Sequence, residues 1–160
     1  MIMLKIDVKK CMTELLLRST FDSFSFIEGT ITTFCQFTID GFLHKSFFEE
    51  APEKEYADWK DLREYCFSII KGKQTPLDFK FILSLPEEGI ASLISENSLD
   101  FRPADVQGLY LNFRYDGMNL TCITGTSFKS FSMDKSLEQR WDKWVQNFFT
   151  EKGIDWDLSS

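Results

Sequence analysis

The sequence has few of the residues that mark exported, membrane-spanning or metal-dependent proteins. Its 160 residues include one histidine, four prolines and four cysteines. No two cysteines have the CxxC spacing of a zinc site. No apolar run approaches the ~18 residues that span a bilayer, and the first ten residues lack the pattern of a signal peptide. We therefore expect a cytoplasmic protein with reduced thiols, no metal and no cofactor.

Basic charge is also scarce. The formal net charge is −7, and no run of lysine or arginine is longer than Lys9-Lys10. A nucleic-acid-binding protein needs a basic surface that displaces counterions from phosphates. The acidic residues are spread along the chain and form no block, which is typical of a soluble protein. We expect neither a nucleic acid nor a membrane as partner, and the sequence identifies no small-molecule ligand.

Linkers and repeats are absent as well, so we expect a single domain over residues 1–160. The length is that of one ordinary domain, and 17 phenylalanines, four tryptophans and four tyrosines provide an aromatic core. Residues 153–160 are expected to form a flexible tail, in which Trp156 is a docking anchor.

Apolar residues at helical spacing predict four helices. The first is expected at about Val8 to Arg18, with Asp7 as its N-cap. The second covers about 56–71, and a short third helix follows Pro86. The fourth runs over about 135–152 and ends at Gly153. Three of the four tryptophans lie on the apolar stripes of these helices and are assigned to the core.

Strict alternation of apolar and polar residues predicts strands between the helices. It is present at 27–39 and at 77–85. Asp116-Gly117 predicts a β-hairpin with a two-residue turn, in which Phe113 lies opposite Leu120, with Leu111, Cys122 and Tyr115 on the same apolar face.

A second Asp-Gly pair, Asp40-Gly41, predicts another such hairpin. It would place His44 opposite Phe37, and Phe34 opposite Phe47. The sum is an α+β fold: a mainly antiparallel sheet of about six strands, with about four helices packed on it.

His44 is the one candidate for acid–base catalysis, because its pKa lies near neutrality. The predicted hairpin makes Cys35 its diagonal neighbour, so a Cys–His pair is one hypothesis. The favoured interpretation is a hydrogen-bonded histidine at the edge of the core. All four cysteines fall on apolar faces and are interpreted as unpaired, mostly buried core residues.

A second candidate site is the sheet face opposite the main core. The predicted registers place apolar residues there that a monomer would not leave open to water. We expect a helix, a ligand or a second copy of the chain to cover them, and a homodimer is slightly favoured. The candidate binding surface consists of Phe34, Leu43, Phe47, Tyr110 and Ile123, with Ile82 placed in the same way.

Four stretches carry a resemblance to a known group of proteins: residues 31–48, 59–81, 108–127 and 134–149. They resemble an uncharacterised domain-of-unknown-function family of small single-domain proteins from anaerobic, gut-dwelling, low-GC Gram-positive bacteria. The resemblance covers the chain from Met1 to about Gly153. It implies a bacterial cytoplasmic protein, and it implies no activity, cofactor or catalytic residue.

Two functions from different classes follow as hypotheses. The first is a non-catalytic binding or assembly module that uses the outer sheet face or an exposed strand edge. The second is a small enzyme with His44 as general base, assisted by Cys35 or a carboxylate.

Overall fold

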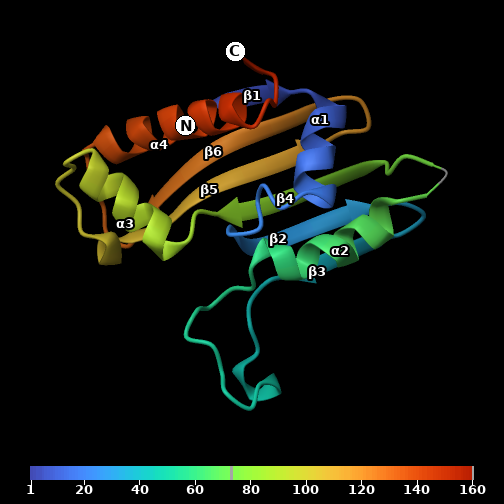
Figure 1. The fold of residues 1–160 in the computed structure, drawn as a ribbon, viewed down its shortest axis with the longest axis horizontal. Coiled ribbons are helices and arrows are strands. Elements are labelled where there is room, and N and C mark those ends of the chain that lie inside the picture. The colour runs from blue at the N-terminus through green and yellow to red at the C-terminus, as the bar shows by residue number, and fades with distance from the viewer. Residues whose placement is uncertain (73, 160) are drawn as a thin grey trace.

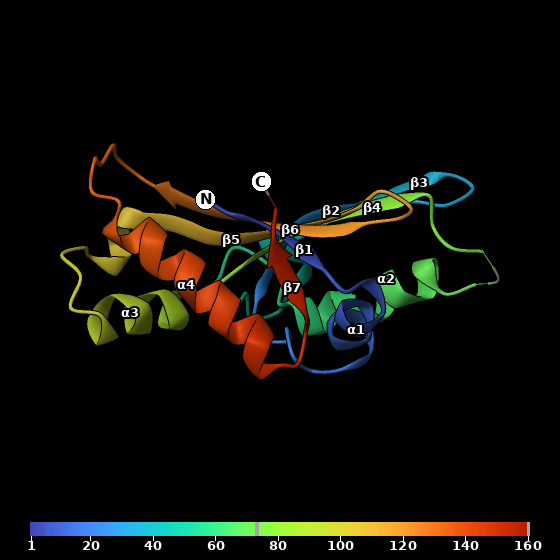
Figure 2. The ribbon, with the colours of Figure 1, turned by 90° about the horizontal axis from the view of Figure 1, so that it is seen from above.

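The protein is an α+β structure in which one antiparallel sheet is covered by helices on a single face. The computed structural model describes residues 1–72 and 74–159. Four α-helices and a seven-stranded sheet confirm the predicted fold class, with one strand more than expected. Figure 1 shows the strands side by side, and Figure 2, turned by 90°, shows all four helices on the same side of the sheet.

Every pair of neighbouring strands in the sheet is antiparallel. In order across the sheet the strands are β3 (Gln36–Asp40), β2 (Ser25–Thr32), β4 (Asp78–Ser84), β5 (Val106–Tyr115), β6 (Leu120–Phe128), β1 (Met3–Ile6) and β7 (Trp156–Leu158). The N-terminal strand thus lies near one edge, beside the strand that ends the described chain. The strands β2 and β3 form the opposite edge.

The helices form close to where their sequence patterns predict them: α1 (Val8–Met12), α2 (Trp59–Ile70), α3 (Glu87–Glu96) and α4 (Ser136–Glu151). Asp7 caps α1 as predicted, since its carboxylate accepts the backbone N–H of Lys10 at 2.9 Å. Gly153 follows α4 with a left-handed φ of +71°. The helix predicted to continue to Arg18 changes after Met12 into a π-helical turn, Thr13–Leu17.

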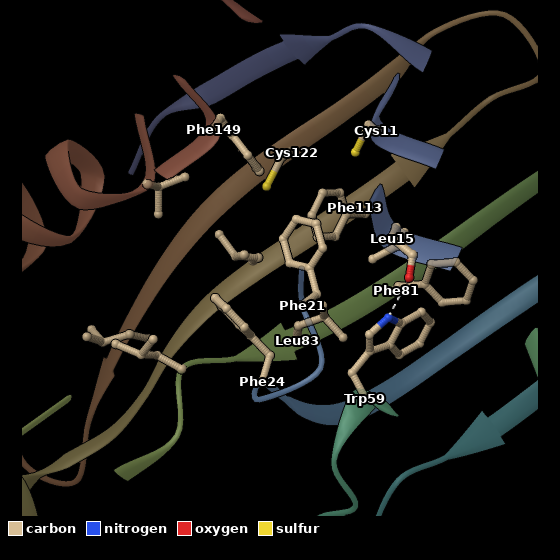
Figure 3. Packing of buried hydrophobic residues seen from close by; sticks show 14 of the residues in the cluster. Cys11, Leu15, Phe21, Phe24, Trp59, Phe81, Leu83, Phe113, Cys122 and Phe149 are labelled. Atoms are coloured by element: carbon tan, nitrogen blue, oxygen red, sulfur yellow. Dashed lines mark hydrogen bonds between the residues drawn. The ribbon is translucent and has the colours of Figure 1, made fainter. Parts of the chain in front are cut away.

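The π-helical turn makes a contact with the first residue of α2. The buried indole N–H of Trp59 donates to the backbone carbonyl of Leu15 at 2.8 Å. Leu15 lies in the last turn of this element, where backbone carbonyls have no intrahelical partner. The Trp59 ring packs on Phe26 and Phe81, with ring centroids 5.5 and 5.3 Å away. Figure 3 shows this bond and the neighbouring core side chains.

The core lies between the sheet and the helices. Alternate residues of the central strands point into it and are fully buried, as with Phe81 on β4, Phe113 on β5 and Cys122 on β6. From the helices, Trp141 and Phe149 of α4 complete this layer. The tryptophans 59, 141 and 144 belong to the core as predicted, and Trp144 is partly buried there.

The hairpin at Asp116-Gly117 has the predicted faces and a different register. Phe113 pairs with Cys122 and not with Leu120, a shift of two residues. The Asp116 carboxylate accepts the backbone N–H groups of Met118 and Asn119, at 2.9 and 2.7 Å, and so stabilises a longer loop. Because the shift is an even number of residues, every side chain keeps its predicted face.

The hairpin predicted at Asp40-Gly41 is wrong. The alternating segment 27–39 is itself a hairpin: β2 turns at 33–35 into β3, and Ile31 pairs with Phe37. Gly41 is needed here for space, since a Cβ at this position would lie 1.9 Å from the carbonyl oxygen of Phe26. Beyond Gly41 the chain leaves the sheet, and Figure 1 shows the segment between β3 and α2 reaching away from the body of the molecule.

The segment after Gly153, expected as a flexible tail, contains the seventh strand. β7 pairs with β1, and Ile154 just before it is 1% exposed. The Trp156 indole N–H donates to Thr150 Oγ1 at 3.0 Å, which attaches this expected docking anchor to the end of α4.

Candidate functional site

The face of the sheet opposite the helices, here called the outer face, is the main candidate site. No helix of the described residues lies over it (Figure 2). Strand alternation turns half of the side chains of each strand towards this face. Among them are Tyr110 and Ile123, two of the predicted binding residues, and Ile82.

An apolar row crosses the middle of the outer face. Ile82 pairs with Asn112, Asn112 with Ile123, and Ile123 with Met3. The two isoleucines are half-buried, and Met3 is 39% exposed. The Asn112 amide donates to the carbonyl of Ile123 at 3.0 Å, so this polar side chain is held within the row.

Tyr110 extends the apolar row on the adjacent rung of the sheet, where its backbone partners are Ser84 and Gly125. Its ring covers Gly108: a Cβ there would lie 2.3 Å from the Tyr110 Cζ atom, so any other residue at 108 would push the ring aside. Burial raises the pKa of the Tyr110 phenol, with a smaller contribution from Tyr56. The phenol therefore remains neutral at physiological pH and acts as a hydrogen-bonding group.

A basic row runs beside the apolar one. Lys80 pairs with Arg114, Arg114 with Thr121, and Thr121 with Lys5. None of the three cations takes part in a salt bridge within the described part of the chain. Their charge is therefore available to a partner, although the chain as a whole carries −7.

One acidic residue lies at an end of each row. Asp157 on β7 pairs with Lys5 across the backbone, and Glu28 on β2 is the partner of Ile82. The outer face thus has an apolar centre with charges of both signs around it. The residues missed by sequence reasoning are Met3 and Lys5. The alternation that marks their strand extends over only four residues, 3–6.

The structure separates the two candidate catalytic residues. Cys35 precedes β3, and His44 follows it on the segment that leaves the sheet. The five residues of β3 lie between them. Because an extended strand rises about 3.4 Å per residue, Cys35 and His44 are at opposite ends of this strand. The prediction that they are diagonal neighbours is wrong, because it depended on the Asp40-Gly41 hairpin. His44 is exposed and not at the core edge, and its ring contacts that of Phe42, with centroids 6.4 Å apart.

Three predicted binding residues also lie off the outer face. Phe34 is at the tip of the β2–β3 hairpin and is 92% exposed. Phe47 is 85% exposed in a 3-10 turn at Lys45–Phe47, so it is no cross-strand neighbour of Phe34. Leu43 lines an open groove of about 380 Å³ beneath the projecting segment, together with Phe47, Phe48, Ala57 and Leu62, and with Asp40, Gly41, Phe42 and His44.

The cysteines differ in exposure. Cys11, Cys66 and Cys122 are buried, as predicted, whereas Cys35 is exposed at the hairpin tip, contrary to the prediction. Burial raises the pKa of the Cys66 thiol to about 12 and also raises that of Cys11 and Cys122. The three buried thiols are therefore protonated and poor nucleophiles. No disulfide links the four residues.

Two kinds of feature are absent from residues 1–72 and 74–159. No three side chains of the metal-binding types come together there. No helix in this part of the chain combines the length and the apolar character needed to cross a membrane.

Residues 14–157 match a family described as a family of unknown function, DUF5721. The chain belongs to the DUF5721 family. This agrees with the resemblance to a domain-of-unknown-function family over most of the chain, and the family description names no activity. No curated protein and no solved structure gave a significant match to the chain.

Proposed function

We propose that the protein is a non-catalytic binding module that holds a protein partner on its outer face. The observation that carries the proposal is the position of the helices: all four lie on one side of the sheet. The other side has Ile82, Ile123, Met3 and Tyr110 at its centre and charged residues around them. An apolar centre with a polar rim is the usual composition of a protein–protein interface.

The charges on the outer face indicate the kind of partner. Lys80, Arg114 and Lys5 form a row without ion pairs inside the described chain. A protein partner with acidic side chains beside an apolar patch would complement this row, and opposite charges speed association and fix its orientation. The net charge of −7 opposes binding to nucleic acid.

The enzymatic alternative, with His44 as general base, has less support. Cys35 lies at the other end of β3, and the groove near His44 is lined mainly by apolar side chains. The four free thiols are consistent with a module that works in the reducing cytoplasm of a bacterium.

A photo-crosslinking residue placed at Ile123 tests the proposal in cells that produce the protein. The matched control carries the same residue at Lys143, an exposed position on α4, on the helical side of the molecule. We expect a discrete crosslinked protein from position 123 and not from position 143. The captured protein, once identified and purified, should bind the wild type. The absence of an adduct at 123, or the same adduct at both positions, would overturn the proposal.

A further inference from the structure

The two edges of the sheet differ in how they are protected against pairing with another strand. Proteins usually protect edge strands by shortness, proline, lysine or bulges. β7 has only three residues, with Asp157 at their centre. β3 has five, and its sequence, QFTID, contains no proline and no lysine. β3 therefore has fewer of these protective features than β7 and is the more open edge.

The hydrogen bonds around β3 show which of its backbone groups face outward. Gly41 donates to the carbonyl of Ile27 and Thr33 donates to that of Cys35, each at 2.9 Å. Both bonds continue the ladder in which Ile31 pairs with Phe37. Bonded pairs alternate along an antiparallel ladder, so the odd-numbered residues of β3 bond to β2.

The even-numbered residues Gln36, Thr38 and Asp40 direct their N–H and C=O groups to the open edge. None of these backbone groups has another partner within the described residues. We propose that this edge binds β3 of a second copy of the chain, antiparallel and about a two-fold axis through Thr38. In this register every outward N–H and C=O group of the three residues is paired.

The side chains fit the same register. Gln36 of one copy lies opposite Asp40 of the other, so an amide meets a carboxylate on the outer face. Phe37 lies opposite Ile39 on the face that carries the helices, where both are only half-buried. A shift of the two strands by two residues leaves outward groups unpaired, and a larger shift brings Asp40 opposite Asp40. The strand is therefore complementary to itself in one register.

Two exposed aromatic residues extend the match beyond the strand. In the register centred on Thr38, the hairpin turn that carries Phe34 of one copy lies beside Phe42 of the other. These side chains are 92% and 48% exposed in the single chain. Phe42 remains on the open edge, because the segment that pairs with it, around Tyr56, lies on its inner side, between it and the start of β2. Each end of the paired strands thus brings two exposed aromatic side chains into the same region, which favours their packing.

This pairing would join the two sheets into one and place the two outer faces side by side. A binding module of this form would present two copies of its surface to one partner or to two. The dimer itself does not depend on the proposed function, because it involves the edge strand and not the outer face.

Sedimentation equilibrium of the full-length protein tests the inference through two pairs of variants. Thr38→Lys places like charges opposite each other on the axis, and Thr30→Lys adds the same charge to the neighbouring strand on the same face. Phe34→Glu removes an aromatic ring at the end of the paired strands. Its control, Phe131→Glu, makes the same substitution at an equally exposed site outside the proposed interface.

We expect the wild type to have twice the chain mass of 18.7 kDa. The Thr30→Lys and Phe131→Glu variants should also be dimers, whereas Thr38→Lys should be a monomer and Phe34→Glu should dissociate at a higher concentration. Circular dichroism checks that each variant is folded. If Thr38→Lys unfolds, Thr38→Pro replaces it, since the lost N–H faces outward and the ladder with β2 is kept. A monomeric wild type, or a dimer that survives the Thr38 variant, would overturn the inference.

Discussion

Replacement of Gly41 with alanine tests the junction where the chain leaves the sheet. The φ of Gly41 is not left-handed, so alanine meets no conformational strain there. Its Cβ, however, would lie 1.9 Å from the carbonyl oxygen of Phe26 and 2.8 Å from the Phe26 ring. The backbone here is fixed by two hydrogen bonds, Phe26 N–H to Ala57 at 2.8 Å and Ala57 N–H to Gly41 at 2.9 Å. Neither strand can move aside without breaking them.

Overpacking usually destabilises a protein by about 1–3 kcal/mol. Because the clash at Gly41 is with backbone, we expect the upper end of this range, about 3 kcal/mol. For a chain of this length that corresponds to a fall in Tm of roughly 6–12 °C. Urea unfolding followed by tryptophan fluorescence measures the change. Gly125→Ala is the matched control, since the nearest atoms to its Cβ lie at an ordinary 3.6 Å and its stability should be close to that of the wild type.

A second substitution at position 41 distinguishes two reasons for the glycine: the close packing seen in the structure and the two-residue turn that the sequence suggests. In a two-residue Asp-Gly turn, position 41 would have a left-handed φ, which asparagine tolerates. In the structure asparagine adds more atoms at the same clash, so Gly41→Asn should be at least as unstable as Gly41→Ala. A Gly41→Asn variant with wild-type stability would refute the reasoning.

Three further predictions concern single side chains. Ellman's reagent should titrate Cys35 rapidly in the native protein and the three buried thiols only in denaturant; four rapid thiols would contradict their burial. A hydrogen bond from Thr20 and contacts with Lys10 lower the pKa of Glu14 below its ordinary 4.5. The ionised Glu14 carboxylate therefore stabilises the fold above that pH. This contribution to stability is lost as the pH falls through the lowered pKa. Urea midpoints should therefore show Glu14→Gln less stable than the wild type at neutral pH, with a difference that shrinks in acid; a constant difference would argue against this linkage. Trp59→Phe leaves a buried carbonyl without its donor and should lower the free energy of unfolding by about 1–3 kcal/mol, and an unchanged urea midpoint would show that this bond is unimportant.

The elements of the fold could be predicted from the sequence where a local pattern determines them. The apolar stripes of α2 and α4 and the Asp7 cap depend on neighbouring residues, and each prediction was confirmed to within a few residues. The β5–β6 hairpin kept its faces, since alternation determines which side chains are buried. Its register depended on how many N–H groups the Asp116 carboxylate would bind, which the Asp-Gly pair alone does not specify.

The β2–β3 hairpin was missed because its turn has no turn residues. Thr33, Phe34 and Cys35 include neither glycine, proline nor asparagine, so the alternation appeared to continue through them. Gly41 then supplied a false turn signal, since a glycine required by close packing cannot be distinguished by sequence from one required by a left-handed φ. This single error misplaced Phe34, Phe47 and His44 together. The outer-face residues Tyr110 and Ile123 were placed correctly because they belong to the hairpin whose faces were right.

The central claim is that a protein partner binds to the outer face. Isothermal titration of the protein captured through position 123 tests it most directly, with the wild type, Ile123→Asp and Lys143→Glu compared under one buffer. We predict that Ile123→Asp weakens binding at least tenfold, about 1.4 kcal/mol, while Lys143→Glu binds like the wild type. Equal affinity of the wild type and Ile123→Asp, with both folded, would contradict the claim.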